Sequence, residues 1–306
     1  MYGWRRSCIA WPLRFVLTLA SLVAMSSNPN EPDCGFVGCR LRAGTEQLFA
    51  TSVEAQRVDQ ETCGRLAHGI AAIETALPDQ LLNFSFLVNM IRAIGLTPSD
   101  NETHERTWYG DERVHTIRDY IAFGKFGQVG LWQVPHQLAC FLSKIAPLRP
   151  ASILEIGTWS GWTSAVLAAY LRRLRPGHKA LDFDTVDIAY LITPCLRHLH
   201  DSLSIRFHLG ALATLSDLAA YDLCIIDGPH TIQGTLDLMQ RLTGRCRTFV
   251  FHDVVNDAMN EREYPLLWRQ IKLGYPGYTE ECVMQPAGAR VSTMGFGILH
   301  SPASVT

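Results

Sequence analysis

Acidic and histidine side chains follow the apolar runs in the second half of the sequence. Asp187 ends one run, the stretch Asp227-Gly228-Pro229-His230 ends another, and His252-Asp253 ends a third. Carboxylate oxygens are ligands of hard cations, and an imidazole that titrates near neutrality can accept a proton. Such residues can equally cap helices or form turns. If they meet at one edge of a sheet, they could instead hold a cation and act as a base.

The stretch 151–163, ASILEIGTWSGWT, comes before all of these acids. A short apolar run ends in Glu155 and Gly157, and Gly161 then opens an apolar helical pattern that reaches Leu174. This order predicts a strand, a tight turn and a helix of an α/β domain. Gly157 would let the backbone approach a ligand closely, and the helix N-terminus offers free N–H groups. Glu155, in a buried strand, must find a hydrogen-bond donor.

A dinucleotide site would need G-x-G-x-x-G, whereas the spacing here is Gly157-x-x-x-Gly161. The stretch instead resembles motif I of class I S-adenosylmethionine-dependent methyltransferases. It is most similar to the O-methyltransferases of the catechol O-methyltransferase and macrocin or cephalosporin-tailoring type, whose motif reads E-[IL]-G-x-x-x-G-[YW]-[ST]. The matching residues are Glu155, Gly157, Gly161, Trp162 and Thr163.

The resemblance implies S-adenosylmethionine as the cofactor and assigns a set of residues to it. In the family, the acid at the position of Asp187 accepts hydrogen bonds from the ribose hydroxyls. The residues expected to bind the cofactor are Glu155, Gly157, Thr158, Gly161, Trp162, Thr163, Asp187 and Asp227. The segment 210–213, which should lie near the adenine, lacks a polar side chain that could be assigned to the ring.

The same resemblance implies a catalytic mechanism for methylating a hydroxyl group of a small molecule or sugar. His230 would be the general base, three residues after Asp227. A divalent cation, expected to be Mg²⁺, would be held by Asp227, His252 and Asp253 and would lower the pKa of the acceptor hydroxyl. His252 departs from the all-oxygen pattern of the family, so the identity and the necessity of the metal stay open.

The elements that must position these residues follow an α/β rhythm. The resemblance, which spans about residues 130–300, implies a doubly wound, mostly parallel, seven-stranded Rossmann-like methyltransferase sheet in residues 121–306. The strands after the first are expected at 181–188, 205–210, 221–227, 247–253, 281–284 and 294–300, with helices at 137–145, 164–174 and 264–273. Trp132, Gln133 and His136 either line the pocket or form a packing corner.

Residues 27–120 are expected to form a linker and a helical extension, with helices at 46–76 and 81–94. Before them, residues 1–26 combine three arginines with an apolar run from Phe15 to Ala24, as a signal peptide does. This predicts a secreted or lumenal protein, with an organelle transit peptide or an uncleaved membrane anchor as alternatives. Two sequons, Asn83-Phe84-Ser85 and Asn101-Glu102-Thr103, agree with a lumenal address.

The composition excludes some classes of partner. The chain of 306 residues has a formal net charge of −2 and shows no basic stripe, so nucleic acid is not an expected partner. A membrane is expected only if the leader is not cleaved. With 47% hydrophobic and 18% charged residues, the chain can fill a sizeable core.

Nine cysteines give an odd number. Cys34, Cys39 and Cys63 are candidates for a disulfide in an oxidising compartment. In contrast, Cys140, Cys195 and Cys224 lie in apolar patterns and are expected to be small core residues. The group His198, His200 and His208 looks like a metal cluster, but a solvated surface is the preferred interpretation.

Two alternatives to the methyltransferase remain. The first is a non-catalytic binding or scaffold protein that retains the fold, because a lumenal enzyme would need an imported cofactor. The second is a nicotinamide-dependent oxidoreductase, which the missing middle glycine disfavours.

Overall fold

The structure of the chain is a computed structural model. It describes residues 53–95, 131, 133–175, 177, 180–189, 191–212, 219–228, 231–255, 263–284 and 294–301. Several sequence predictions fall outside these ranges: the leader 1–26, Cys34, Cys39, the sequon at Asn101, Trp132 and His230.

The described strands form one seven-stranded sheet in the order β3-β2-β1-β4-β5-β7-β6. The strands are β1 (Ser152–Ile156), β2 (Asp182–Asp187), β3 (Ile205–Leu209), β4 (Tyr221–Ile226), β5 (Cys246–His252), β6 (Thr279–Cys282) and β7 (Phe296–His300). Strands β1 to β5 pair in parallel, and β7 runs antiparallel to both β5 and β6. The predicted doubly wound, mostly parallel sheet is confirmed.

One strand lies earlier than predicted. The sequence pattern placed the sixth strand at 281–284, whereas β6 spans Thr279–Cys282. The prediction left out Thr279 and Glu280, because a polar residue followed by two successive glutamates, Glu280 and Glu281, interrupts the apolar pattern. Glu280 pairs with Lys144 and His300, and Glu281 pairs with Lys272. These ion pairs let an acidic segment join the edge of the sheet.

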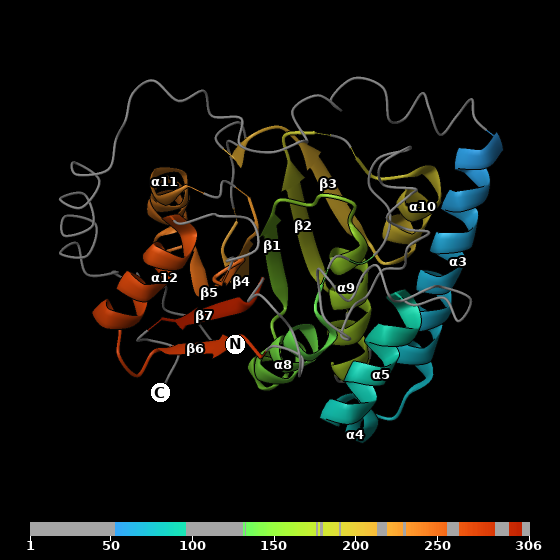
Figure 1. Cartoon of the computed structure of the whole chain (residues 1–306), viewed down its shortest axis with the longest axis horizontal. Helices are drawn as coiled ribbons and strands as arrows, with labels where there is room; N and C mark the ends of the chain where they lie inside the picture. Colours follow the sequence, from blue (N-terminus) through green and yellow to red (C-terminus); the bar gives the residue numbers. More distant parts are fainter. Residues whose placement is uncertain are drawn as a thin grey trace, which may run out of the picture.

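Helices cover both faces of the sheet (Figure 1). They are α3 (Val53–Thr75), α4 (Pro78–Leu81), α5 (Phe84–Gly95), α8 (Pro135–Ile145), α9 (Trp162–Leu174), α10 (Pro194–Ser202), α11 (Ile232–Leu242) and α12 (Glu263–Gly274), with a short 3-10 helix at Ala146–Leu148. Side chains alternate between the faces. Ile153 packs into the core beneath α9, whereas Leu154 and Ile156 pack with residues of α11 and α12.

The N-terminal helices share the core of the α9 face. Leu66 of α3 and Ile91 of α5 are fully buried in the same cluster as Ile153. Tyr170 of α9 donates a hydrogen bond to the carbonyl of Leu81, at 3.2 Å, and Arg173 donates to the carbonyl of Ala76, at 2.9 Å. The described part of the predicted helical extension is therefore a further layer that packs on α8 and α9, outside the sheet (Figure 1). The boundary between 27–120 and 121–306 stays a prediction.

Three disulfides cross-link the described residues. They join Cys63 to Cys195, Cys140 to Cys282, and Cys224 to Cys246. The prediction that Cys140, Cys195 and Cys224 are only small core residues is wrong. A cysteine in an apolar pattern gives no sign of its partner when that partner lies 132 or 142 residues away, as here for the first two bonds. Cys63 does form a disulfide, and its partner is Cys195.

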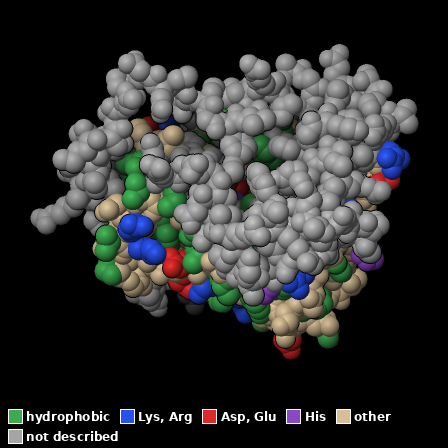
Figure 2. Space-filling model, viewed as in Figure 1, with side chains coloured by type: hydrophobic (Ala, Val, Ile, Leu, Met, Phe, Trp, Pro, Cys, Tyr) green, Lys and Arg blue, Asp and Glu red, His purple; other side chains and the backbone are tan. Residues whose placement is uncertain are grey.

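Figure 2 shows basic and acidic side chains side by side on the described surface. In that view the described residues form no patch of charge of one sign. Within the described ranges, none of the helices is both long and apolar enough to cross a bilayer.

Candidate active site

The turn after β1 lies where the strand order reverses, since β1 sits between β2 and β4. Ligands of open α/β sheets bind at the carboxyl ends of the strands near such a point. Gly157 has a φ of 95°, and its N–H donates to the carbonyl of Val186 at 2.8 Å. A Cβ on Gly157 would lie 1.8 Å from the carbonyl oxygen of Asp227. Only glycine allows this close approach between the ends of β1 and β4.

The rest of the turn is closed by backbone bonds. The N–H of Gly161 donates to the carbonyl of Thr158 at 2.8 Å, and Gly161 has a φ of 78°. Trp159 also has a left-handed backbone, with a φ of 49°. A non-glycine residue held in this region is strained, and such strain concentrates at ligand-binding sites. We call residues 157–161 the cofactor turn.

Asp187, predicted to hold ribose, lies directly beside the cofactor turn. Its Oδ2 accepts a hydrogen bond from the N–H of Trp159 at 2.8 Å, and its Oδ1 accepts from the N–H of Ala189 at 3.0 Å. Burial raises the pKa of Asp187, against the opposing effect of these backbone donors. The carboxylate is thus fixed at the mouth of the turn, where the sequence placed it.

Glu155 lies beneath the turn, in the layer covered by α9. Its side chain is buried and accepts hydrogen bonds from the hydroxyls of Ser164 and Thr185, the latter at 2.6 Å. Burial raises the pKa of Glu155 to about 7, although both hydroxyls act to lower it. Glu155 has therefore found the donors that its burial requires, and it supports the turn from below. Direct contact with the cofactor stays a prediction.

The side chains of the other predicted cofactor residues are mostly packed inward. Thr158 is buried, and its hydroxyl lies 2.6 Å from that of Thr185. Trp162, the first residue of α9, belongs to the core. Thr163 accepts a hydrogen bond from the Gln133 amide at 3.5 Å. In this region a ligand would meet the backbone of the turn more than these side chains.

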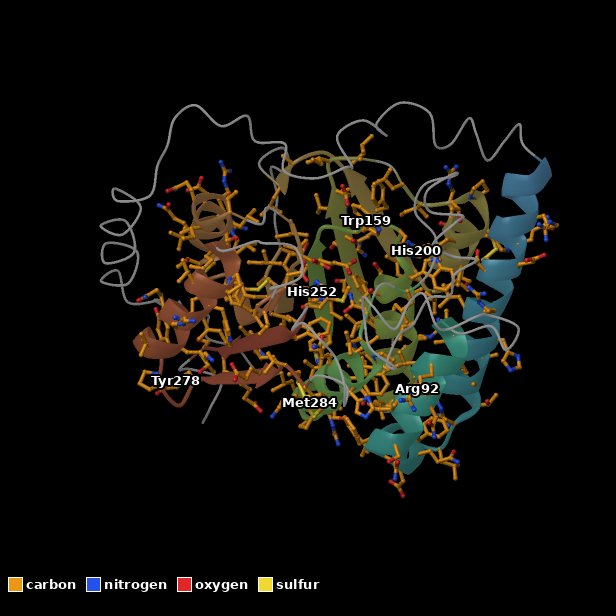
Figure 3. The ribbon with its side chains drawn as sticks, viewed as in Figure 1. Arg92, Trp159, His200, His252, Tyr278 and Met284 are labelled. Carbon is orange, nitrogen blue, oxygen red and sulfur yellow. A yellow bond between two sulfur atoms is a disulfide. The ribbon has the colours of Figure 1, made fainter. Side chains whose placement is uncertain are left out.

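Asp227, His252 and Asp253 come together at the ends of β4 and β5. Their ligand atoms all lie within 4.8 Å of one another. The Nδ1 atom of His252 lies 2.9 Å from Oδ1 of Asp227 and 3.5 Å from Oδ1 of Asp253. Asp253 has a φ of 56°, again a strained backbone at a site. We call these three residues the acidic cluster; Figure 3 labels His252.

The donor set of the acidic cluster fits a divalent cation. Two carboxylates and one imidazole can supply two oxygen ligands and one nitrogen ligand, with neutralising charge. The cluster also borders the cofactor turn, since the Asp227 carbonyl is the atom that a Cβ on Gly157 would meet. The structure thus brings together the predicted metal residues and places them next to the predicted cofactor residues.

Gln133 connects the two groups. Its side chain is buried, with its Oε1 atom 3.0 Å from Nε2 of His252 and its Nε2 atom 3.5 Å from the Thr163 hydroxyl. The sequence named Gln133 only as a possible pocket residue, because nothing in its local pattern points to β5. The ring of His136 lies edge-on to Phe84 of α5, at 5.7 Å between centroids, which places it in the helical layer.

The histidines that the sequence assigned to a solvated surface behave differently from one another. His198 is exposed, and His208 pairs with Asp184 at 2.7 Å. His200 is only 3% exposed, and its Nε2 lies 2.8 Å from the carbonyl oxygen of Gly161. Burial lowers the pKa of His200. The surface prediction is wrong for His200, because one turn of α10 faces inward onto the cofactor turn.

Residues 154–254 match a family model described as a methyltransferase domain. A search of curated proteins finds no match. Three solved structures are similar: an O-methyltransferase from Bacillus cereus in complex with SAH (14% identity, 55% of this chain and 82% of that chain, TM-score 0.41), TomG from Streptomyces achromogenes, involved in tomaymycin synthesis (14%, 60% and 88%, 0.42), and a putative O-methyltransferase from Klebsiella pneumoniae (13%, 87% and 99%, 0.40). At these values the structural likenesses carry no argument about substrate, metal or mechanism.

The domain match, the strand order and the glycine turn after β1 agree with one another. They identify residues 154–254 as a methyltransferase domain, so the predicted class of enzyme, a methyltransferase, is confirmed. Membership of the O-methyltransferase family stays a prediction. Enzymes of this class take the methyl group from S-adenosylmethionine. The cation, the acceptor and the role of each site residue stay predictions.

Proposed function

We propose that the protein is an O-methyltransferase that moves the methyl group of S-adenosylmethionine onto a hydroxyl oxygen of a small molecule or sugar, with the help of a divalent cation. The observation that carries this proposal is the position of the acidic cluster, whose members lie within 4.8 Å of one another beside Gly157 of the cofactor turn. Methyl donor and activated oxygen must meet at such a junction for an in-line transfer.

In this mechanism the cofactor turn and Asp187 bind and orient the methyl donor. Backbone N–H groups near the start of α9 suit the carboxylate of its amino-acid part. Asp187, held by Trp159 and Ala189, suits the ribose hydroxyls. The bound cofactor supplies an electrophilic methyl group, and the protein supplies alignment.

Asp227, His252 and Asp253 would hold the cation, which supplies positive charge beside the acceptor oxygen. Gln133 fixes the ring of His252 from the side opposite to Asp227. We assign His230, three residues after Asp227, as the base that takes the hydroxyl proton. The acceptor is expected to be a small molecule rather than nucleic acid.

We further propose that the protein works in the secretory pathway or outside the cell. Three disulfides within the described residues support an oxidising compartment. The sequon residue Asn83 is exposed, and its side chain accepts a hydrogen bond from the N–H of Phe86 at the start of α5.

Calorimetric titration tests the cofactor. We expect the protein to bind S-adenosylmethionine and S-adenosylhomocysteine and not to bind NAD. Binding of neither class of cofactor would contradict the proposal and favour a scaffold that retains the fold. Binding of NAD alone would favour an oxidoreductase.

The base and the cation are tested with a panel of hydroxyl acceptors and labelled methyl donor. We expect turnover to require added Mg²⁺ or Mn²⁺ and to stop with a chelator. His230→Ala should lower turnover at neutral pH about 10²-fold or more, as expected for the loss of a general base. Unchanged turnover of this variant would remove His230 from the mechanism, and full activity in chelator would remove the cation.

A further inference from the structure

The cofactor turn is held at its far end by a side chain from another crossover. The carbonyl oxygen of Gly161 accepts two hydrogen bonds, one from the N–H of Ala165 at 3.2 Å and one involving Nε2 of His200 at 2.8 Å. The first bond belongs to the opening turn of α9. The second comes from α10, which follows β2. Figure 3 labels His200 of α10 and Trp159 of the cofactor turn.

The chemistry of this contact fixes the state of the imidazole. A carbonyl oxygen can only accept, so Nε2 of His200 must carry the hydrogen. Among the described residues, Nδ1 of the ring has no hydrogen-bond partner, and the ring is buried. The ring therefore acts as a neutral single donor, directed at one carbonyl.

The ring also accounts for the glycine beneath it. A Cβ on Gly161 would lie 2.6 Å from Cε1 and 2.8 Å from Nε2 of His200. The imidazole thus fills the space where a side chain would stand, against a backbone with a φ of 78°. The space filled by the His200 ring and its hydrogen bond to the Gly161 carbonyl together determine where the turn ends and where α9 begins.

Helix α10 is itself anchored. Thr193 caps its first turn by accepting from the N–H of Leu196, and Leu196 is buried in the core. The disulfide from Cys195 to Cys63 ties the same turn to α3. A continuous path of packed and bonded groups therefore runs from the N-terminal helical layer, through α10, to the cofactor turn.

We infer that His200 is a positioning residue for cofactor binding: its Nε2–H holds the Gly161 carbonyl, and thereby the N–H groups at the start of α9, in the orientation that the methyl donor needs. The Cys63–Cys195 disulfide keeps His200 in place. The inference goes beyond the proposed function in assigning a role to a residue that is not part of the acidic cluster, and it rests on that function only for the identity of the ligand.

Three variants of the full-length protein test the inference. His200→Phe keeps a flat ring and removes the donor, whereas His200→Gln keeps a donor N–H. His198→Ala is the matched control, because His198 is exposed two residues away on the same helix. We expect His200→Phe to raise the Kd for S-adenosylmethionine about tenfold, as for one lost hydrogen bond, and His200→Gln to recover part of this loss. His198→Ala should bind as the wild type does.

Kinetics and redox state give a second readout. His200→Phe should raise the KM for the methyl donor and leave the KM for the acceptor unchanged, a split that a general loss of stability would not produce. Replacing both Cys63 and Cys195 by serine should raise the Kd in the same direction. A folded His200→Phe protein with the Kd and KM of the wild type would overturn the inference.

Hydrogen exchange separates this inference from the proposed function. In ligand-free protein, His200→Phe should speed amide exchange of residues 157–165 about tenfold relative to His198→Ala, because one bond that restrains the turn is lost. If the wild type binds no S-adenosylmethionine, the proposed function fails, and the exchange result still decides the positioning role. Equal exchange in the two variants would refute that role whatever the ligand.

Discussion

The two halves of the ligand-facing edge of the sheet are held in different ways. At the ends of β1 and β2, Asp187 and the cofactor turn are fixed mainly by backbone N–H groups and carbonyls. At the ends of β4 and β5, side chains converge on one another, with His252 between Asp227 and Gln133. Backbone hydrogen bonds fix the shape of the first half, as expected of a region that would recognise a ligand by shape. The second half gathers charge at one point, as a cation site does.

The largest loss of stability is expected from a substitution at Gly157, where the two halves of this edge are in contact. Gly157→Ala would place a Cβ 1.8 Å from the carbonyl oxygen of Asp227, in a backbone conformation with a φ of 95°. Since neither backbone segment can move without breaking strand pairing, we expect a loss of unfolding free energy of about 4 kcal/mol or more, measured by urea denaturation.

Gly64→Ala is the control for this substitution. A Cβ on Gly64, on the exposed side of α3, would meet nothing within 4 Å. Alanine in a helix interior stabilises relative to glycine by about 0.5–1 kcal/mol. Equal unfolding free energies for the Gly157 and Gly64 variants would show that the halves are not in the contact described.

The next largest effect is a loss of metal affinity and of turnover when a charge is removed from the acidic cluster. Asp227→Asn keeps the shape of the side chain and removes its charge, so the affinity for Mn²⁺ in calorimetry should be lost. We expect kcat/KM to fall on the order of 10³-fold, which corresponds to about 4 kcal/mol of transition-state stabilisation, while the protein remains folded.

The control is Asp237→Asn, on the exposed face of α11, where Asp237 contacts Gln233. It should leave kcat/KM unchanged. Asp187→Asn should act differently from both, by raising the KM for the methyl donor without changing the affinity for Mn²⁺. If Asp227→Asn keeps its metal affinity, the distinction between a shape-selecting half and a charge-gathering half is wrong.

The smallest effect is a pH dependence of stability that differs between two buried acids on adjacent strands. Burial raises the pKa of Glu155 from its ordinary 4.5 to about 7. A raised pKa in the folded state contributes stability below pH 4.5 that is lost as the pH rises through 7. Glu155→Gln, which is always neutral, should therefore gain stability relative to the wild type between pH 5 and pH 8, by at most about 3 kcal/mol.

Asp184 of β2 should show the opposite dependence. Burial alone would raise its pKa, but hydrogen bonds from Arg206, His208 and Tyr221 outweigh burial and lower it from 3.8 to about 2. Its contribution is present above pH 4 and is lost as the pH falls towards 2, so Asp184→Asn should cost about 2 kcal/mol at neutral pH and less in acid. Parallel pH profiles for the two variants would contradict the assignment of these environments.

Much of the fold follows from local sequence signals. Apolar runs that end in an acid or a glycine mark β1, β2, β4 and β5, and Gly157 marks the turn because few other residues adopt its conformation. Residues at the carboxyl ends of parallel strands then meet by topology alone, which explains why Asp187, Asp227 and Asp253 could be placed near one another.

The remaining features depend on long-range packing, which leaves no local trace. The sequence predicts a surface position for His200 because His198, His200 and His208 lie across a helix end and a strand, yet the chain folds the His200 ring onto Gly161. Gln133 gives no sign of His252, 119 residues away. Cys195 looks like any small apolar residue until α3 packs beside α10.

The Cys63–Cys195 bond also joins the parts of the chain on either side of residues 96–130. Between Gly95 and Leu131 the residues after which trypsin can cut are Arg106, Arg113, Arg118 and Lys125. Cleavage after any one of them would divide the polypeptide without separating its pieces. The products would migrate as one band in non-reducing electrophoresis and as two after treatment with dithiothreitol.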